Sequence, residues 1–275
     1  MINENRKNKP SELSAQEVYI QNHRKKHHLV TCWRIMIFLG FLTLWELSAG
    51  LGWIDSFFFS SPSRVISCFI DMALDGSLFL HTGITLWETI FSFLLVFVIS
   101  IAAATLLWAS SKLSDILEPY LVILNSLPKS ALAPLFIVWL GTGTTTIIVA
   151  GISVAVFGSI ISFYTGFKQV DPEKITLIYT LGGHKKEVFT KVILPGSIPI
   201  MLSTTKVNIG LALVGVIIGE FLAARRGLGY LIIYGSQVFQ LNLVITSITI
   251  LCIIAFGFYK GIQVLEHQMK VRMKM

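Results

Sequence analysis

The chain has 275 residues, of which 54% are hydrophobic and 13% are charged, and its mean hydropathy is +0.73. Soluble domains carry about 25% charged residues, so this composition excludes a water-facing surface of ordinary size and indicates a protein solvated by lipid. The net charge of +7 does not indicate a nucleic-acid partner, because most basic residues flank long apolar segments and form no basic face. The three cysteines are far apart and belong to no metal-binding motif, so we expect no metal site.

Six apolar segments are long enough to cross a membrane, which requires about 20 mostly apolar residues. They are Ile35–Trp53, Thr82–Trp108, 117–140, 146–166, Ile198–Leu222 and Leu243–Tyr259. The glycine- and threonine-rich stretch at 141–146 supplies the turn between the third and the fourth. We therefore expect an all-α integral membrane protein with about six transmembrane helices. Its transmembrane domain covers residues 32–265, between a polar N-terminal tail at 1–31 and a basic C-terminal tail at 266–275.

The loop at residues 55–81, between the first two spans, contains a shorter apolar segment. It opens with three phenylalanines, which are followed by Ser61-Pro62-Ser63. The pattern after them predicts a short amphipathic helix near Pro62–Leu74 that lies at the membrane interface.

The distribution of basic residues predicts the orientation of the chain. Six spans place both termini on the same side of the membrane, together with the loop at 168–197. Basic residues concentrate on that side, whereas the other side carries only Arg64, Arg225 and Arg226. Because positively charged loops tend to stay in the cytoplasm, we expect both termini to be cytoplasmic.

The loop at 168–197 has the signals of a well-capped short helix. Asp171 is a good N-cap, Pro172 suits the first helical position, and Gly182-Gly183 forms a C-terminal stop. Such a loop is either an amphipathic segment that rests on the lipid headgroups or a rigid knob that another protein can push.

The same loop predicts an apolar face and a second helix. Ile175, Ile178 and Leu181 are expected to share one face of the first helix. The second helix is predicted from about Lys185 to Val192, and the following Ile-Leu-Pro sequence leads back into the membrane.

Four segments of the chain resemble the motifs of bacterial ABC importer permeases. Ser61-Pro62-Ser63 resembles the outer "PSP" segment of that family, and Leu127-Pro128-Lys129 with Ala133–Gly143 resembles its third-span signature. Asp171–Pro195 resembles its "EAA" loop, and Gly219–Leu231 resembles the segment after its fifth span. These segments cover about residues 60–265 in the order of the family. The resemblance is best to the branch that imports nitrate, sulfonates, taurine and related small organic solutes, including vitamin precursors.

The resemblance implies a type I-like ABC importer permease with a cytoplasmic coupling helix in the 168–197 loop. In that family the coupling helix is seated in a groove of an ATPase subunit. The implied ATPase-coupling residues are Asp171, Pro172, Ile175, Thr176, Ile178, Leu181, Gly182, Gly183 and Pro195. Where the family usually has Glu-Ala-Ala, this chain has Thr176-Leu177-Ile178, so it lacks the glutamate that helps to dock the loop in many members.

The resemblance also implies partners and a location. The partners are a second permease copy in a homodimer around a central pathway, two ABC ATPase subunits, and an extracytoplasmic solute-binding protein. The location is the bacterial plasma (inner) membrane, and the transported solute is small and organic, either anionic or vitamin-like.

The sequence contains no motif of an enzyme. It has no G-x-x-x-x-G-K-[ST] loop, so ATP and Mg²⁺ are expected on a separate ATPase and no cofactor is expected on this chain. It has no HExxH motif or nucleophile elbow, so we predict no catalytic residue. Two rival hypotheses are an ion-gradient-driven secondary transporter, which often has internal repeats and broken spans, and a membrane-embedded enzyme.

Ionisable residues inside the spans are candidates for the transport pathway, because a charge in the membrane is costly. Glu220 is predicted either to line or gate the outer end of the pathway or to pair locally with Arg225 or Arg226. Lys206 either meets an anionic solute or a carboxylate near the inner mouth, or reaches the lipid headgroups. Lys129 follows a proline, where a distorted helix exposes carbonyl groups, and is expected either to pair within the bundle or to contact solute.

The remaining predictions concern structural residues. Gly215 and Gly219 have the spacing that allows two membrane helices to approach closely. Glu46 and Glu88 are interpreted as structural rather than ligand-binding acids.

Overall fold

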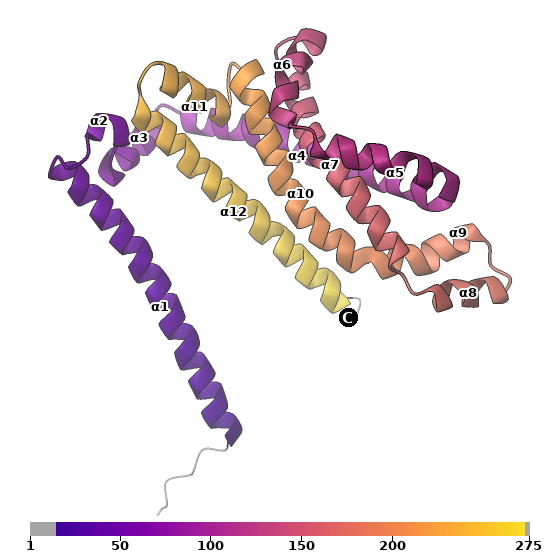
Figure 1. The fold of residues 1–275 in the computed structure, drawn as a ribbon. Coiled ribbons are helices and arrows are strands. Elements are labelled where there is room, and N and C mark those ends of the chain that lie inside the picture. The colour runs from indigo at the N-terminus through magenta and orange to yellow at the C-terminus, as the bar shows by residue number, and fades with distance from the viewer. Residues whose placement is uncertain (1–14, 273–275) are drawn as a thin grey trace, which may run out of the picture. The chain divides into compact units, whose positions relative to one another are not determined.

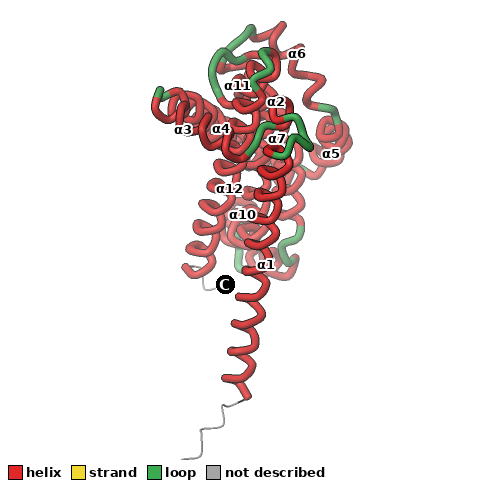
Figure 2. Tube along the Cα trace, turned by 90° about the vertical axis from the view of Figure 1, so that its left-hand side faces the viewer, coloured by secondary structure: helices red, strands yellow, loops and turns green. Residues whose placement is uncertain are grey.

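The computed structural model describes residues 15–272, and within that range every regular element is a helix. The predicted all-α fold is therefore confirmed. The chain divides into two compact units, one that ends at Ser63 and one that begins at Arg64. Figure 2 shows that the described chain consists of helices joined by short loops.

The first unit contains a long helix, α1 (Ala15–Gly50), and a short one, α2 (Ser56–Phe59). The helix α1 begins inside the predicted N-terminal tail, of which residues 1–14 lie outside the described range. None of the most apolar stretch of α1, within Leu29–Gly50, is buried, as is typical of a helix solvated by lipid. Glu46 of α1 accepts hydrogen bonds from the backbone nitrogen and the hydroxyl of Ser63, at 3.0 and 2.8 Å. Within this unit Glu46 is therefore structural, as predicted.

The helix predicted near Pro62–Leu74 is present as α3 (Pro62–Leu74), with the predicted bounds. Its Met72 is buried in an apolar cluster with Leu228 and Leu251. The short helix is thereby fixed to the bundle of the second unit.

Three helices form the centre of the second unit: α4 (Ser77–Ala109) and α7 (Thr144–Lys168), which run in the same direction, and α10 (Leu194–Ala223), which runs antiparallel to both. The helix α7 packs against both α4 and α10, and half of its most apolar stretch is buried. Two further helices, α11 (Leu228–Gln237) and α12 (Leu241–Arg272), pack on each other and on α10. Figure 1 shows α6 and α11 at one end of α7 and α10, and α8 and α9 at the other end.

The expected span at 117–140 is not one continuous helix. It consists of α5 (Ser111–Ser126) and α6 (Lys129–Leu140), whose axes are bent by 95° at the break. Proline has no N–H to donate and disfavours helical geometry in the residue before it. Leu127, which precedes Pro128, is accordingly extended, with φ −62° and ψ 140°. The described range therefore contains five helices that are long and apolar enough to span a membrane, or six if this bent pair is one span.

The predicted second helix of the 168–197 loop is not a separate element. The helix α9 (Lys185–Val188) passes through a π-helical turn, η1 (Phe189–Ile193), directly into α10. The turn is closed by the amide of Leu194, whose partner is the carbonyl of Phe189. Pro195 has no backbone N–H to donate to a helical hydrogen bond. The wider π-helical turn lets the helix continue through this point. Only α8 (Pro172–Thr180) stands apart as a short helix.

Candidate functional site

The helix α8 is closed at both ends by the residues that the sequence indicated. The Asp171 carboxylate accepts a hydrogen bond from the backbone nitrogen of Glu173 at 2.9 Å, and Pro172 occupies the first turn. At the other end the amides of Gly182 and Gly183 donate to the carbonyls of Tyr179 and Ile178, at 3.0 and 2.9 Å. Gly182 has φ +82°, which favours glycine, so the chain reverses within two residues.

The helix α8 is packed on the bundle by two of its isoleucines, and three large apolar side chains on it or just after it are exposed. Ile175 and Ile178 pack against the core cluster that contains Phe167, Val188 and Ile193. Leu177, Tyr179 and Leu181 are instead 58%, 44% and 74% exposed.

The expectation that Leu181 shares a face with Ile175 and Ile178 is wrong. The helix ends at Thr180, so Leu181 follows the helical period only in the sequence and points away from the core. Thr176, which stands where the family has glutamate, is exposed, and its hydroxyl donates to the carbonyl of Pro172 at 3.0 Å.

The corner formed by α8 and α9 is firmly joined to α10. Val188 and Ile193 are completely buried at the start of the continuous α9–η1–α10 helix. The ammonium of Lys185 also donates to the carbonyl of Ala109, at the end of α4, at 3.3 Å. The α8–α9 corner is therefore held to α10 and α4 by packed side chains and a hydrogen bond rather than by a loose loop.

Near the α11 end of the bundle, Glu220 joins three helices. It is 1% exposed and lies near the end of α10. Its carboxylate accepts a hydrogen bond from the Thr85 hydroxyl of α4 at 2.7 Å and from the Gly229 amide of α11 at 2.6 Å. Thr85 in turn accepts from the amide of Leu228 at 2.8 Å. The alternative in which Glu220 pairs with Arg225 or Arg226 is wrong, since the ion pairs found among the described residues include neither arginine.

Glycine is required around this carboxylate. A Cβ atom at Gly229 would lie 2.8 Å from an Oε2 atom of Glu220, closer than any real contact. Gly227, with φ +117°, donates its amide to Nδ1 of His81 at 3.0 Å, and a side chain there would overlap the Glu220 carboxylate. The glycines of the segment after α10 therefore let its backbone pass close to the buried acid, to which the Gly229 amide donates.

We expect Thr85→Val to destabilise the purified chain by about 1–3 kcal/mol, because it leaves buried polar groups of Glu220 and Leu228 without their partner. Thr105→Val is the matched control in the same helix, since its hydroxyl bonds only to the carbonyl of Ile101 one turn earlier. Thermal unfolding in detergent, followed by gel filtration, measures both variants. Equal midpoints for the two variants would show that the Glu220 network contributes no stability.

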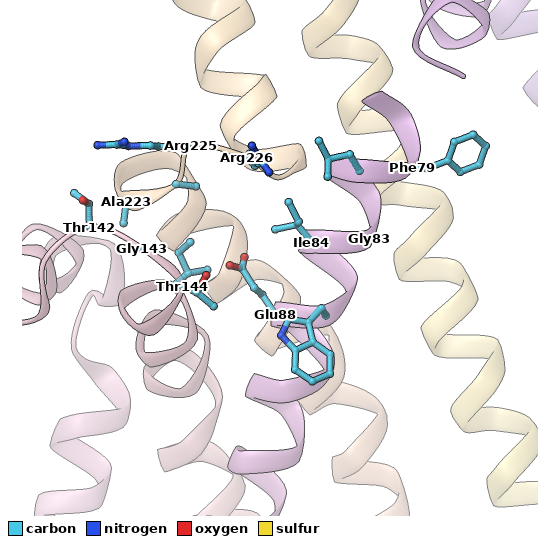
Figure 3. Close-up of a pocket in the computed structure, with 14 residues that line it drawn as sticks. Phe79, Gly83, Ile84, Glu88, Thr142, Gly143, Thr144, Ala223, Arg225 and Arg226 are labelled. Carbon is cyan, nitrogen blue, oxygen red and sulfur yellow. The ribbon is translucent and has the colours of Figure 1, made fainter. Parts of the chain in front are cut away.

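A pocket of about 770 Å³ lies beside this network. Its walls come from the first turns of α4, the segment that leads into α7 and the end of α10. Figure 3 shows the Glu88 carboxylate pointing into it, below Arg225 and Arg226 and between Thr144 and Ile84.

The sequence-based interpretation of Glu88 as a purely structural acid missed its place in this pocket. Glu88 is 1% exposed, and its carboxyl group interacts with that of Glu220. The sequence did contain a signal for this pairing, since Glu88 and Glu220 both interrupt long apolar spans at the same predicted depth. Their proximity, however, depends on how α4 packs on α10.

The two candidate lysines are both paired within the bundle. Lys206 of α10 forms an ion pair with Glu266 of α12, and both side chains are mostly buried. Lys129 donates to the carbonyls of Leu124 and Asn125, the last turn of α5, at 2.6 and 2.5 Å. A cation at these carbonyls is favourable because they form the negative end of a helix dipole.

Gly215 and Gly219 lie where α10 approaches α7 most closely. A Cβ atom at Gly215 would lie 2.7 Å from Cα of Gly151 and 2.8 Å from the carbonyl oxygen of Ala150. At Gly219 it would lie 2.8 Å from Cα of Ile147. The two helices touch through their backbones, as small residues allow in membrane proteins.

The fold and these two regions define a class of protein: a polytopic helical membrane protein with a capped, partly exposed helix pair built onto its central helices. Residues 96–263 match the model of a family described as the binding-protein-dependent transport system inner membrane component. That match covers more than half of the chain, and the chain belongs to this family.

Two relatives agree with this membership, and one solved structure has a similar fold. A probable ABC transporter permease protein of Haemophilus influenzae is 30% identical over 227 residues, which cover 82% of this chain and 92% of the relative. The taurine transport system permease protein TauC of Escherichia coli is 26% identical over 234 residues, or 83% of this chain and 85% of TauC. The fold is similar to that of a chain of the inward-facing MetNI methionine ABC transporter, with a TM-score of 0.59 and 20% sequence identity, covering 66% of this chain and 91% of that chain.

The protein is thus an ABC importer permease of the branch that includes sulfonate and taurine permeases. It is a multi-pass protein of the kind found in the bacterial inner membrane.

Proposed function

We propose that this chain is the membrane-spanning subunit of an ATP-driven importer that acts as a homodimer with two separate ATPase subunits. In this proposal α8 is the coupling helix, and an extracytoplasmic binding protein delivers a small organic solute to the opposite end of the bundle. ATP and Mg²⁺ bind to the ATPase subunits, and the permease contributes no catalytic group.

One observation carries the proposal: α8 and its C-terminal end expose three large apolar side chains. Leu177 and Tyr179 on α8, and Leu181 just after it, are exposed, whereas Ile175 and Ile178 of the same helix pack into the core. Several large apolar side chains exposed close together on a rigid support are typical of a protein interaction site. An ATPase groove would cover this surface, whereas a loop that only rested on lipid would need neither the double cap nor the packed inner side.

The orientation follows from the basic residues. Lys174, Lys185 and Lys186 lie around the α8 corner, and the positive-inside rule places such a segment in the cytoplasm. Both termini are then cytoplasmic, and the pocket near Glu88 faces the outside. ATP binding closes the ATPase dimer and moves α8, and the continuous α9–η1–α10 helix carries this movement toward the outer end.

An ion-gradient-driven secondary transporter is the second candidate, and the broken span at Leu127–Pro128 is the observation that favours it. In such a transporter the exposed side chains of α8 would have no partner. The two candidates therefore differ in whether an ATPase subunit co-purifies with the permease.

We expect a tagged permease to co-purify an ATPase subunit from native membranes, and Leu177→Asp with Tyr179→Asp to abolish that co-purification. The two carboxylates would be desolvated in an apolar groove without partners, which is unfavourable by several kcal/mol. The conservative pair Leu177→Met with Tyr179→Phe is the matched control and should retain the subunit. A folded permease that never brings down an ATPase, yet takes up solute along an ion gradient in liposomes, would establish the rival.

A further inference from the structure

The pocket beside Glu88 is remote from α8 and plays no part in the coupling described above. Its volume of about 770 Å³ falls in the range of about 300–1,000 Å³ that small-molecule sites occupy. Its walls are largely apolar and include Phe79, Ile84 and Trp87. A few polar groups converge on this apolar space, as in most ligand sites.

The first of these groups is the Glu88 carboxyl. It is 1% exposed and interacts with the Glu220 carboxyl and the Thr144 hydroxyl, but its Oε2 atom has no hydrogen-bond partner among the described residues. The Glu220 carboxyl beside it is already satisfied by Thr85 and Gly229. A buried acceptor without a donor is unfavourable, and two neighbouring buried carboxyl groups favour an added positive charge. A protonated amine would supply both the N–H donor and the charge.

The opposite side of the pocket is basic. Arg225 and Arg226 line it and lie above Glu88 in Figure 3. Guanidinium groups bind carboxylates, sulfonates and phosphates through paired hydrogen bonds. Neither arginine forms an ion pair with a carboxylate among the described residues. The pocket thus presents an acid at its base, two cations at its rim and an indole, that of Trp87, which can pack against a cation.

We propose that this pocket binds a small zwitterionic solute, with its protonated amine at Glu88 and its oxyanion group at Arg225 and Arg226. This inference rests on the proposed function, and it adds the chemical class of the solute and a place where the permease itself binds it. An aminosulfonate or an amino acid has both charges within a few bonds and fits the space.

The test measures direct binding to the full-length chain in lipid nanodiscs by saturation-transfer NMR, which detects weak ligands. Three probes separate the two ends of the pocket: taurine, which has both charges, ethanesulfonate, which lacks the amine, and ethylamine, which lacks the sulfonate. We expect taurine to bind best. Glu88→Gln should weaken taurine about tenfold or more, because a charged hydrogen bond is lost, and should leave ethanesulfonate unchanged. Arg225→Gln with Arg226→Gln should weaken taurine and ethanesulfonate but not ethylamine.

Glu118→Gln is the matched carboxyl control, because Glu118 is exposed beside Lys168 and does not line the pocket. It should bind taurine as the unmodified chain does. If Glu88→Gln does not elute as a folded protein, the rim arginines decide the question, since both side chains are exposed. Equal taurine binding in the unmodified chain and in the rim variant, or no binding of any probe to the unmodified chain, would overturn the inference.

Uptake by the complete transporter separates this inference from the proposed function. Normal ATP-driven uptake of the solute by Glu88→Gln and by the rim variant would overturn the pocket assignment and leave the importer intact. Failure of the unmodified permease to co-purify any ATPase subunit would overturn the importer and leave direct binding to the pocket measurable.

Discussion

Gly215→Val is expected to prevent the chain from forming its helical bundle, and Gly215→Ala to destabilise that bundle by about 1–3 kcal/mol. The physical reason is that the added Cβ meets backbone atoms of α7, the Cα of Gly151 and the carbonyl of Ala150, rather than a side chain that can rotate away. The helices α7 and α10 would have to separate, and their contact is the most extensive one in the second unit. Thermal unfolding in detergent, followed by fluorescence-detected gel filtration, measures the loss.

Gly210→Ala is the matched control for this prediction. Gly210 lies in the same helix, but no atom lies within 4 Å of a Cβ placed there. Alanine is favoured over glycine in a helix by up to about 1 kcal/mol, so this variant should be as stable as the unmodified chain or slightly more stable. If Gly215→Ala and Gly210→Ala unfold at the same temperature, α7 and α10 do not meet through their backbones as described.

Gly182→Val is expected to uncouple ATP hydrolysis from solute uptake and to lower the uptake per ATP at least tenfold. Gly182 has φ +82°, a conformation that costs a β-branched residue about 1–3 kcal/mol, whereas the space around it is open. The variant should therefore fold and still bind the ATPase, but the corner between α8 and α9 would adopt a different angle. The measurement is solute uptake and phosphate release by the complete transporter in liposomes.

Gly182→Asn is the control for the corner, because asparagine tolerates the left-handed conformation and should retain coupling. Normal uptake per ATP in Gly182→Val would mean that the geometry of this corner does not transmit the movement of the ATPase. Loss of coupling in both variants would point to a need for the small size of glycine instead of its backbone conformation.

The local features of this protein could be predicted from residues close together in the chain. Asp171, Pro172 and the Gly182-Gly183 stop define α8 through hydrogen bonds within that segment, and the helix at Pro62–Leu74 has its predicted bounds. The membrane spans were predictable because the length of an apolar run is set by the thickness of the bilayer. From the sequence, Pro128 indicated only a distorted helix, and the 95° bend between α5 and α6 could not be predicted.

The faces of the helices were decided only by the tertiary structure. In water the apolar face of a helix is the buried face, but in a membrane both the lipid-facing and the buried faces are apolar, so periodicity does not distinguish them. Outside the spans, Leu181 was assigned to the wrong side because α8 ends at Thr180, and α9 was taken for a separate helix although it continues into α10.

The polar contacts between spans were likewise beyond the sequence. Glu88 and Glu220 come from α4 and α10, and the partner of Lys206 is Glu266 of α12, so each contact depends on the packing of distant segments. The amino-acid sequence by itself determined the membrane class, the spans and the capped helix α8, because short-range hydrogen bonding and transfer into lipid act on each segment separately. The pocket beside Glu88 was decided by the tertiary structure, because it exists only where several helices meet. The exposed residues of α8 were decided by it too, because they are the ones that do not pack on the bundle.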